Sequence, residues 1–144
     1  MKNLKIIIYL AFSVVIVACR GTVDSVVYGD SKTGIFLKFI DSNGDDIDLY
    51  MSSLSVYKKP KSTNELTEIY WEIAYPDEKI NKNLQRHHLI KYGLTPKGYK
   101  VSHPIKKLSE LQIYYYSIEG GDTTTAGCFY IKDNNVVQLS GTDC

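Results

Sequence analysis

The sequence predicts an all-β protein that folds as a single antiparallel β-sandwich of the immunoglobulin or fibronectin III type. Short segments rich in β-branched and aromatic residues recur at intervals of about ten residues. Turn-forming Gly, Asn, Asp and Pro separate these segments, which favours hairpin-connected strands over helices. Only residues 78–86 are ambiguous, because one helical turn fits them equally well.

The first strand of the predicted domain is at residues 34–40, where the sequence is GIFLKFI. The Asn-Gly pair in residues 41–45 then predicts a hairpin turn, with return strands at 47–51 and 53–58. An additional edge strand at 26–28 stays open, because that segment lies among glycines and aspartates.

Residues 66–75 alternate more clearly than the strands before them. Ile69, Trp71 and Ile73 share one face, so we expect Trp71 to anchor the core. The remaining strands are predicted at residues 88–92, 98–102, 111–118, 127–132 and 136–140. A hairpin turn at 133–135 is predicted to connect the last two.

The first residues have the form of an export signal. Lys2 and Lys5 precede an apolar run at 6–17 that is too short for a permanent membrane helix. Residues 16–19 (IVAC) resemble a bacterial lipobox, which implies that Cys19 is acylated and becomes the mature N-terminus. The sequence thus predicts a signal peptide at 1–18, a lipidated tether at 19–33 and a β-sandwich domain at 34–144. The 126 of 144 residues that follow the signal peptide are enough for one domain.

The resemblance to a lipobox also predicts a location. Acyl chains on Cys19 would hold the domain on a membrane of the cell envelope, facing the periplasm. Arg20 after the cysteine favours the outer membrane. The alternative is ordinary signal-peptide cleavage after Ala18 and release of a secreted protein. Ile16 is bulky for that cleavage, which requires a small side chain three residues before the cut.

The three cysteines agree with export. If Cys19 carries lipid, Cys128 and Cys144 remain as a pair in an oxidising compartment, and we expect them to form a disulfide. A redox or metal-binding thiol pair is the alternative, but such sites have closer spacing.

Charge is divided unevenly along the chain. Residues 24–48 hold six aspartates, whereas 79–107 hold seven lysines, one arginine and three histidines without an acid. Such a run is either a solvated face or a basic surface for an anionic partner. Lys97 and Lys100 are the candidate partner-binding residues of this region. Nucleic acid is not an expected partner outside the cytoplasm.

Metal sites are not predicted. Residues 41–52 begin like a calcium loop, but the glycine is fourth and Ser52 occupies the position of the closing glutamate. His87 and His88 point to opposite faces of a strand, and His103 is the only other histidine.

Catalytic motifs are absent as well. The sequence contains no GxSxG, no HExxH and no Gly-rich phosphate loop, so we expect a binding protein without a cofactor, not an enzyme.

Two further segments are candidates for partner binding. Residues 119–127 form a predicted loop in which Asp122, Thr123 and Thr124 could make adaptable hydrogen bonds; a loop without a role is the alternative. In the run 114–116, Tyr114 and Tyr116 share a face and could contact a partner, or they pack in the core.

The order of several residues resembles a family of small enterobacterial and related lipoproteins, described as type VI secretion immunity periplasmic lipoproteins. The resemblance covers about half of the chain, from 71 to 132, in addition to the lipobox. Its residues are Trp71-Glu72-Ile73, the run YGLTPKGY at 92–99 with the pattern YG..P.GY, Pro104, Leu108, Tyr116 and Phe129-Tyr130-Ile131.

The resemblance implies a periplasmic β-sandwich that neutralises a toxin delivered by a rival or sibling cell. Because its residues are of turn and core type, it transfers no toxin-contacting position. Two alternatives stay open: a structural or assembly lipoprotein of an envelope complex, and a glycan- or lipid-binding module with exposed tyrosines as stacking platforms.

Overall fold

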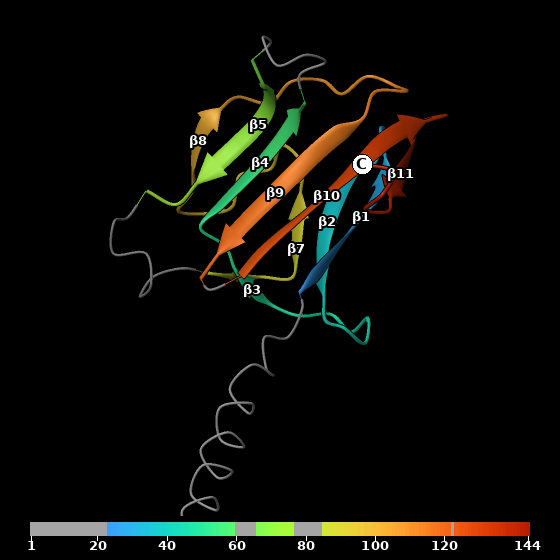
Figure 1. Cartoon of the computed structure of the whole chain (residues 1–144). Coiled ribbons are helices and arrows are strands. Elements are labelled where there is room, and N and C mark those ends of the chain that lie inside the picture. The colour runs from blue at the N-terminus through green and yellow to red at the C-terminus, as the bar shows by residue number, and fades with distance from the viewer. Residues whose placement is uncertain (1–22, 60–65, 77–84, 122) are drawn as a thin grey trace, which may run out of the picture.

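The all-β prediction is confirmed. The computed structural model describes residues 23–59, 66–76, 85–121 and 123–144, and these form eleven strands and no helix (Figure 1). The strands are β1 (Asp24–Asp30), β2 (Gly34–Ile40), β3 (Leu49–Tyr50), β4 (Ser53–Lys58), β5 (Glu68–Ala74), β6 (Arg86–His87), β7 (Leu89–Lys91), β8 (Lys100–His103), β9 (Tyr114–Gly120), β10 (Thr123–Lys132) and β11 (Asn135–Leu139).

Nine of these strands form one antiparallel sheet. Its order is β7-β2-β1-β11-β10-β9-β4-β5-β8, while β3 and β6 pair separately. The sheet curls, so that β2 and β7 lie behind β9 and β10 in Figure 1. The architecture is thus a curled sheet of the half-barrel kind, and a two-sheet immunoglobulin-like arrangement is not confirmed.

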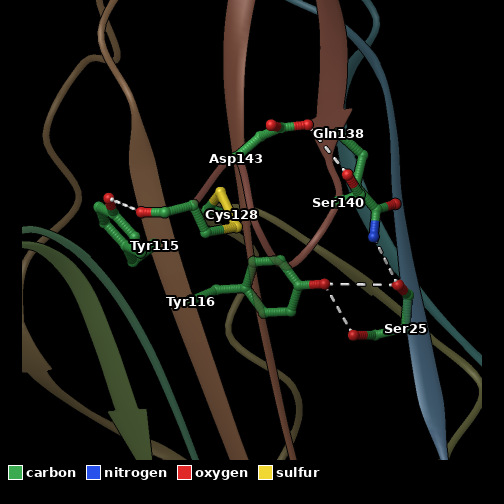
Figure 2. Close-up of a disulfide and its surroundings, with 8 residues drawn as sticks. Ser25, Tyr115, Tyr116, Cys128, Gln138, Ser140 and Asp143 are labelled. Atoms are coloured by element: carbon green, nitrogen blue, oxygen red, sulfur yellow. Dashed lines mark hydrogen bonds between the residues drawn. A yellow bond between two sulfur atoms is a disulfide. The ribbon is translucent and has the colours of Figure 1, made fainter.

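The junction between β1 and β11 is the least regular part of the sheet. Asp30 and Asn135 are the single register pair there, whereas β1 and β2 pair along their whole length. The side chain of Gln138 bridges the gap: its Oε1 accepts the Val27 N–H at 2.9 Å, and its Nε2 donates to the Ser25 carbonyl at 2.8 Å (Figure 2). A side chain therefore replaces part of the backbone ladder where the sheet bends.

The predicted start of the domain at residue 34 is wrong. β1 is an inner strand between β2 and β11, and Ser25 and Val27 on it are buried. The glycine and aspartates of this segment interrupt the apolar–polar alternation that would have predicted a strand. Gly29 is required by close packing, because it has φ +110° and a Cβ there would lie 2.1 Å from the Gly34 carbonyl oxygen.

The core lies on the concave side of the curled sheet. Trp71, as predicted, is one of its anchors, with 1% of its surface exposed. Other side chains with almost no exposed surface come from β2, β4, β5, β9 and β10 and from the link between β3 and β4: Phe39, Leu37, Met51, Leu54, Val56, Ile73, Tyr114, Tyr116, Ile118 and Phe129.

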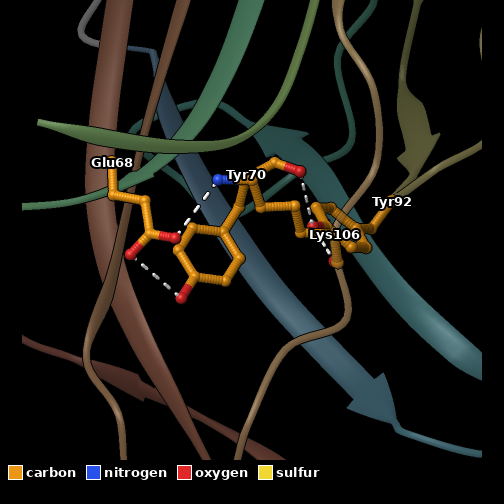
Figure 3. A network of polar contacts seen from close by, with 4 residues as sticks. All are labelled: Glu68, Tyr70, Tyr92 and Lys106. Atoms are coloured by element: carbon orange, nitrogen blue, oxygen red, sulfur yellow. Dashed lines mark hydrogen bonds and ion pairs between the residues drawn. The ribbon is translucent and has the colours of Figure 1, made fainter.

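Tyr92 joins two parts of the sheet that are far apart in strand order. Its ring lies edge-on against Trp71 of β5, with 5.3 Å between centroids. Its hydroxyl donates to the Lys106 carbonyl at 2.8 Å and lies 3.2 Å from the Tyr70 carbonyl, which also accepts the Lys106 N–H at 2.8 Å (Figure 3). Residues 104–108, which we call the strap, are thereby held between β5 and the end of β7.

A turn is present at residues 41–45, as predicted. Asp41 Oδ1 accepts the N–H groups of Asn43 and Asp45, and these hydrogen bonds lower the pKa of Asp41. The predicted return strand at 47–51 is wrong: after one bridge between Ile40 and Asp46, the chain forms only the short β3, which pairs with β6 and not with β2.

The export features fall outside the described residues. The signal peptide at 1–18 and the lipidation site Cys19 belong to the undescribed segment 1–22. Across the remainder that the structure describes, no helix has the length and apolar character needed to cross a membrane.

Candidate functional site

The most accessible strand is β8, at one end of the sheet order. Among the described strands it pairs only with β5, so its other edge carries unpaired backbone groups. All four of its residues are exposed, including Val101 at 49%. An open edge of this kind can accept an extended segment of another chain by strand addition.

Among the described residues, two exposed lysines lie beside β8. Lys97 lies exposed in the turn before β8, where the Tyr99 N–H donates to the Pro96 carbonyl, and Lys100 begins the strand. Within the part of the chain that the structure describes, neither lysine has an ion-pair partner.

The nearby acids are engaged elsewhere. Glu72 lies 2.7 Å from Nδ1 of His103, and Glu68 lies 3.2 Å from Nζ of Lys106. Lys106 is the cationic partner of Glu68, and Glu72 is hydrogen-bonded to His103, so Lys97 and Lys100 remain as lysines near β8 without a paired acid in the described structure. Sequence reasoning missed these pairs, because their members are separated by 31 and 38 positions in the chain. Strand register brings His103 to Glu72, and the strap brings Lys106 to Glu68.

The outer face of the sheet links Lys100 to the second predicted contact segment. Cross-strand pairing places five residues in one row: Lys100, Ala74, Ser53, Glu119 and Thr124. Lys100 and Thr124 stand at its two ends, roughly 19 Å apart at ~4.8 Å per strand. They share one face, but they do not form one compact site.

The adjacent row is flat and polar. Its members are His103, Glu72, Ser55, Ser117 and Ala126. Ser55 Oγ donates to Glu72 Oε1 at 2.9 Å, and His103 contacts the other carboxylate oxygen. The carboxylate therefore stands between serine and histidine, unlike a nucleophilic triad, in which the imidazole contacts the serine.

The predicted loop at 119–127 is wrong. β9 runs to Gly120 and β10 begins at Thr123, and these two residues pair directly, so the hairpin is tight. Thr123 is half-buried and Thr124 is exposed, while Asp122 lies outside the described residues. The Thr-rich run extends a strand because β-branched side chains fit a pleated sheet.

The prediction that Tyr114 and Tyr116 contact a partner does not hold. They are 0% and 1% exposed, because strand alternation turns both toward the concave core. The Ser109 N–H donates to the Tyr114 hydroxyl, and the Tyr116 hydroxyl lies 2.7 Å from Ser25 Oγ. Burial raises the pKa of Tyr116. Tyr114 and Tyr116 therefore cannot be the exposed stacking platforms of the glycan- or lipid-binding alternative, since both rings are inaccessible.

Packing of Tyr116 depends on a glycine in the next strand. Gly127 is its cross-strand neighbour, and a Cβ at that position would lie 2.5 Å from the Tyr116 hydroxyl oxygen. The Tyr116 ring thus occupies the space that a side chain at position 127 would need.

Cys128 and Cys144 are bonded as a disulfide, with 5.8 Å between their Cα atoms (Figure 2). The Tyr115 hydroxyl donates to the Cys144 carbonyl at 2.7 Å, and its ring stacks on Tyr57. The C-terminal residue is thereby fixed to the outer face of the sheet.

A second group of aromatic residues closes the end of the core near β3 and β6. Burial raises the pKa of Tyr99 to about 12, and its hydroxyl donates to the Met51 carbonyl. His87 lies edge-on to Tyr99, and its Nε2 is buried without a hydrogen-bond partner in the described structure. Burial lowers the pKa of His87.

A hollow of about 430 Å³ lies at the His103 end of β8, between Leu66, Ile69 and Pro104. It gives the exposed edge an apolar contact next to its basic residues. No cluster of three His, Cys, Asp or Glu side chains suited to a metal ion occurs within the described ranges.

The chain matches no family model, no curated protein and no solved structure.

Proposed function

We propose that this protein is a membrane-anchored, periplasm-facing lipoprotein of the cell envelope that neutralises a type VI secretion effector by stoichiometric binding. Its anchor would be lipid on Cys19, most consistent with the outer membrane, and no cofactor would take part. The observation that carries the binding role is the open, basic edge of β8, with Lys97 and Lys100 exposed beside it.

Neutralisation by occlusion requires a complementary surface and no chemistry of its own. The unpaired backbone of β8 could hydrogen-bond an extended segment of the effector, and the hollow beside Pro104 could take an apolar side chain of that segment. The two lysines would select an acidic segment and accelerate association, an effect that salt weakens.

We also propose that the curled sheet serves as the β-sandwich that the sequence resemblance implies. The single register pair between β1 and β11 would let the β7-β2-β1 part fold over the core as one layer, with the remaining strands as the other.

A competition assay between sibling cells tests the function. Deleting the gene while leaving its neighbours intact should sensitise cells in contact-dependent competition, and the wild-type gene should restore protection. Undiminished survival of the deletion strain would contradict the immunity role. Copurification with a large membrane complex in place of a single effector would instead indicate an assembly lipoprotein.

Charge reversal tests the surface. The double variant Lys97→Glu, Lys100→Glu should lose protection and effector binding, because an acidic partner segment would now be repelled. Lys132→Glu is the matched control: Lys132 is exposed at the end of β10, four strands from β8 in the sheet. Equal protection by all three proteins would show that binding uses another surface.

Palmitate labelling tests the anchor. Wild-type protein should incorporate the label and sediment with membranes, whereas Cys19→Ser should do neither. Equal labelling of both proteins would contradict acylation of this thiol.

A further inference from the structure

A second hollow, of about 370 Å³, opens where the strap passes the turn between β1 and β2. Its floor is formed by Ile35 and Ile131, which belong to the main core and are 6% and 2% exposed. Ile105 and Leu108 of the strap form a wall. An apolar group inserted here would therefore lie directly on the hydrophobic core.

The wall is fixed in place by contacts described above. Lys106 is hydrogen-bonded through its N–H to Tyr70 and through its carbonyl to Tyr92, which itself lines the hollow (Figure 3). Ile105 lies against Gly93, where φ is +80° and a Cβ would be 2.1 Å from the isoleucine Cδ1. Yet Ile105 remains 53% exposed, so the strap holds a large apolar side chain in contact with water.

Two lysines, Lys106 and Lys107, lie on the rim of the hollow. Lys107 makes no ion pair within the described part of the chain, whereas Lys106 contacts Glu68.

One acid, Asp30, also lines the hollow. Its carboxylate accepts the Thr33 hydroxyl at 2.6 Å and the backbone N–H groups of Lys32 and Thr33 at 2.7 Å. These bonds lower the pKa of Asp30 and turn its oxygens toward the β1–β2 turn. Because the turn holds the oxygens of Asp30 and Lys106 is paired with Glu68, Lys107 is the cation that the described rim offers to an anionic ligand.

We infer that this hollow binds a single-chain anionic amphiphile of the fatty acid class. The acyl chain would lie on Ile35, Ile131 and the strap, and the carboxylate would face Lys107. Such a ligand satisfies both features at once, since an apolar ligand leaves Lys107 unused and a small anion leaves the apolar floor uncovered. The site does not involve Lys97 or Lys100, so it stands independently of the effector-binding proposal.

Trp71 provides the readout, because it is the one tryptophan of the sequence and its ring contacts Tyr92 on the wall of the hollow. The full chain carrying Cys19→Ser, which removes the predicted lipid as a competitor, would be titrated with laurate below its micelle concentration. We expect a saturable change in tryptophan fluorescence with one equivalent of laurate. Dodecyltrimethylammonium has the same chain length with the opposite charge, and it should bind at least about tenfold more weakly.

Two variants locate the site. Lys107→Glu should weaken laurate binding by about tenfold or more, and Ile105→Gln should weaken both amphiphiles. Lys97→Glu is the matched charge reversal outside the hollow and should bind laurate like the parent protein. Denaturant unfolding curves would verify that each variant is folded.

Three results would overturn the assignment: no saturable signal with laurate, equal affinity for the two amphiphiles, or laurate binding unchanged by both Lys107→Glu and Ile105→Gln. Acetate binding as tightly as laurate would also exclude an acyl-chain site, because it would show that the anion alone is recognised.

Discussion

The Tyr92 hydroxyl offers a direct test of how the curled sheet is closed. Tyr92→Phe removes the hydrogen bond to Lys106 but keeps the ring against Trp71. Neither carbonyl is left as a buried orphan: Tyr70 still accepts the Lys106 N–H, and Lys106 is exposed enough for water to replace the hydroxyl. The cost is therefore the net value of one hydrogen bond, about 1 kcal/mol.

Tyr92→Ala removes the ring as well. A buried aromatic truncated to alanine costs about 3–5 kcal/mol, and Tyr92 is only half-buried, so we expect about half of that range for the ring. With the lost hydrogen bond, the free energy of unfolding should fall by about 3 kcal/mol. The loss in the free energy of unfolding should thus be about one third as large in Tyr92→Phe as in Tyr92→Ala, which separates the contribution of the hydrogen bond from that of the packing.

Urea unfolding at neutral pH measures both differences, and amide exchange of the strap measures where they act. Exchange at residues 104–108 should increase in Tyr92→Phe while the β9–β10 amides stay protected, because the strap is joined to the sheet by the bonds around Tyr92. Tyr70→Phe is the matched control, since among the described residues its own hydroxyl makes a single, long 3.4 Å hydrogen bond with Glu68. Equal stability of wild type and Tyr92→Phe, or a loss as large as that of Tyr92→Ala, would refute this account of the closure.

Three other predictions concern stability. Replacing Cys128 and Cys144 with serine should lower the free energy of unfolding by about 3 kcal/mol, the value for a loop near this separation of 16 residues, measured against the oxidised parent; an unchanged denaturation midpoint would contradict it. Gly127→Ala should cost about 1–3 kcal/mol because its Cβ would overlap the Tyr116 ring, whereas Gly141→Ala, with open space around it, should be near neutral in the same assay. Because burial lowers the pKa of His87 below its ordinary 6.5, the unfolded state takes up a proton first, so stability should fall as pH drops below about 6.5. His87→Phe should flatten that decline in unfolding curves recorded between about pH 7.5 and 5; an unaltered slope would contradict it.

Local sequence patterns were sufficient to predict the structure where apolar and polar residues alternate along a strand or where a turn contains a characteristic residue. The strand at 34–40 is β2 with its predicted bounds, and Trp71 is buried as its alternation indicates. The same rule failed at β1, because glycine and aspartate lower β-propensity and only pairing with both β2 and β11 makes that segment a strand. Its prediction required long-range contacts that a local pattern does not contain.

The choice between core and surface for Tyr114 and Tyr116 also depended on distant residues. Alternation showed that they share a face, but not which face. For Tyr116, burial depends on Gly127, which leaves room for its ring. It also depends on Ser25, which lies 91 positions away in the chain and is hydrogen-bonded to the Tyr116 hydroxyl. Likewise, the open edge of β8 follows from its terminal place in the strand order. The sequence located its lysines and could not show that they flank an unpaired strand.

Four residues of the segments compared with lipoproteins in the sequence analysis contribute to the closure of the sheet: Trp71, Gly93, Gly98 and Tyr99. Trp71 packs against Tyr92, and Gly93 gives Ile105 of the strap room to approach. Gly98 has φ +91° and admits the Tyr75 ring at 3.1 Å from where a Cβ would be, while the Tyr99 hydroxyl binds the Met51 carbonyl. These four residues help to determine how the ends of the curled sheet meet. They do not fix the residue type at Lys97 and Lys100 beside the edge of β8, or at Lys107 on the rim of the second hollow. Partner and ligand specificity would therefore reside in residues other than these four, which is why substitutions at Lys97, Lys100 and Lys107 test function and substitutions at Tyr92 test the fold.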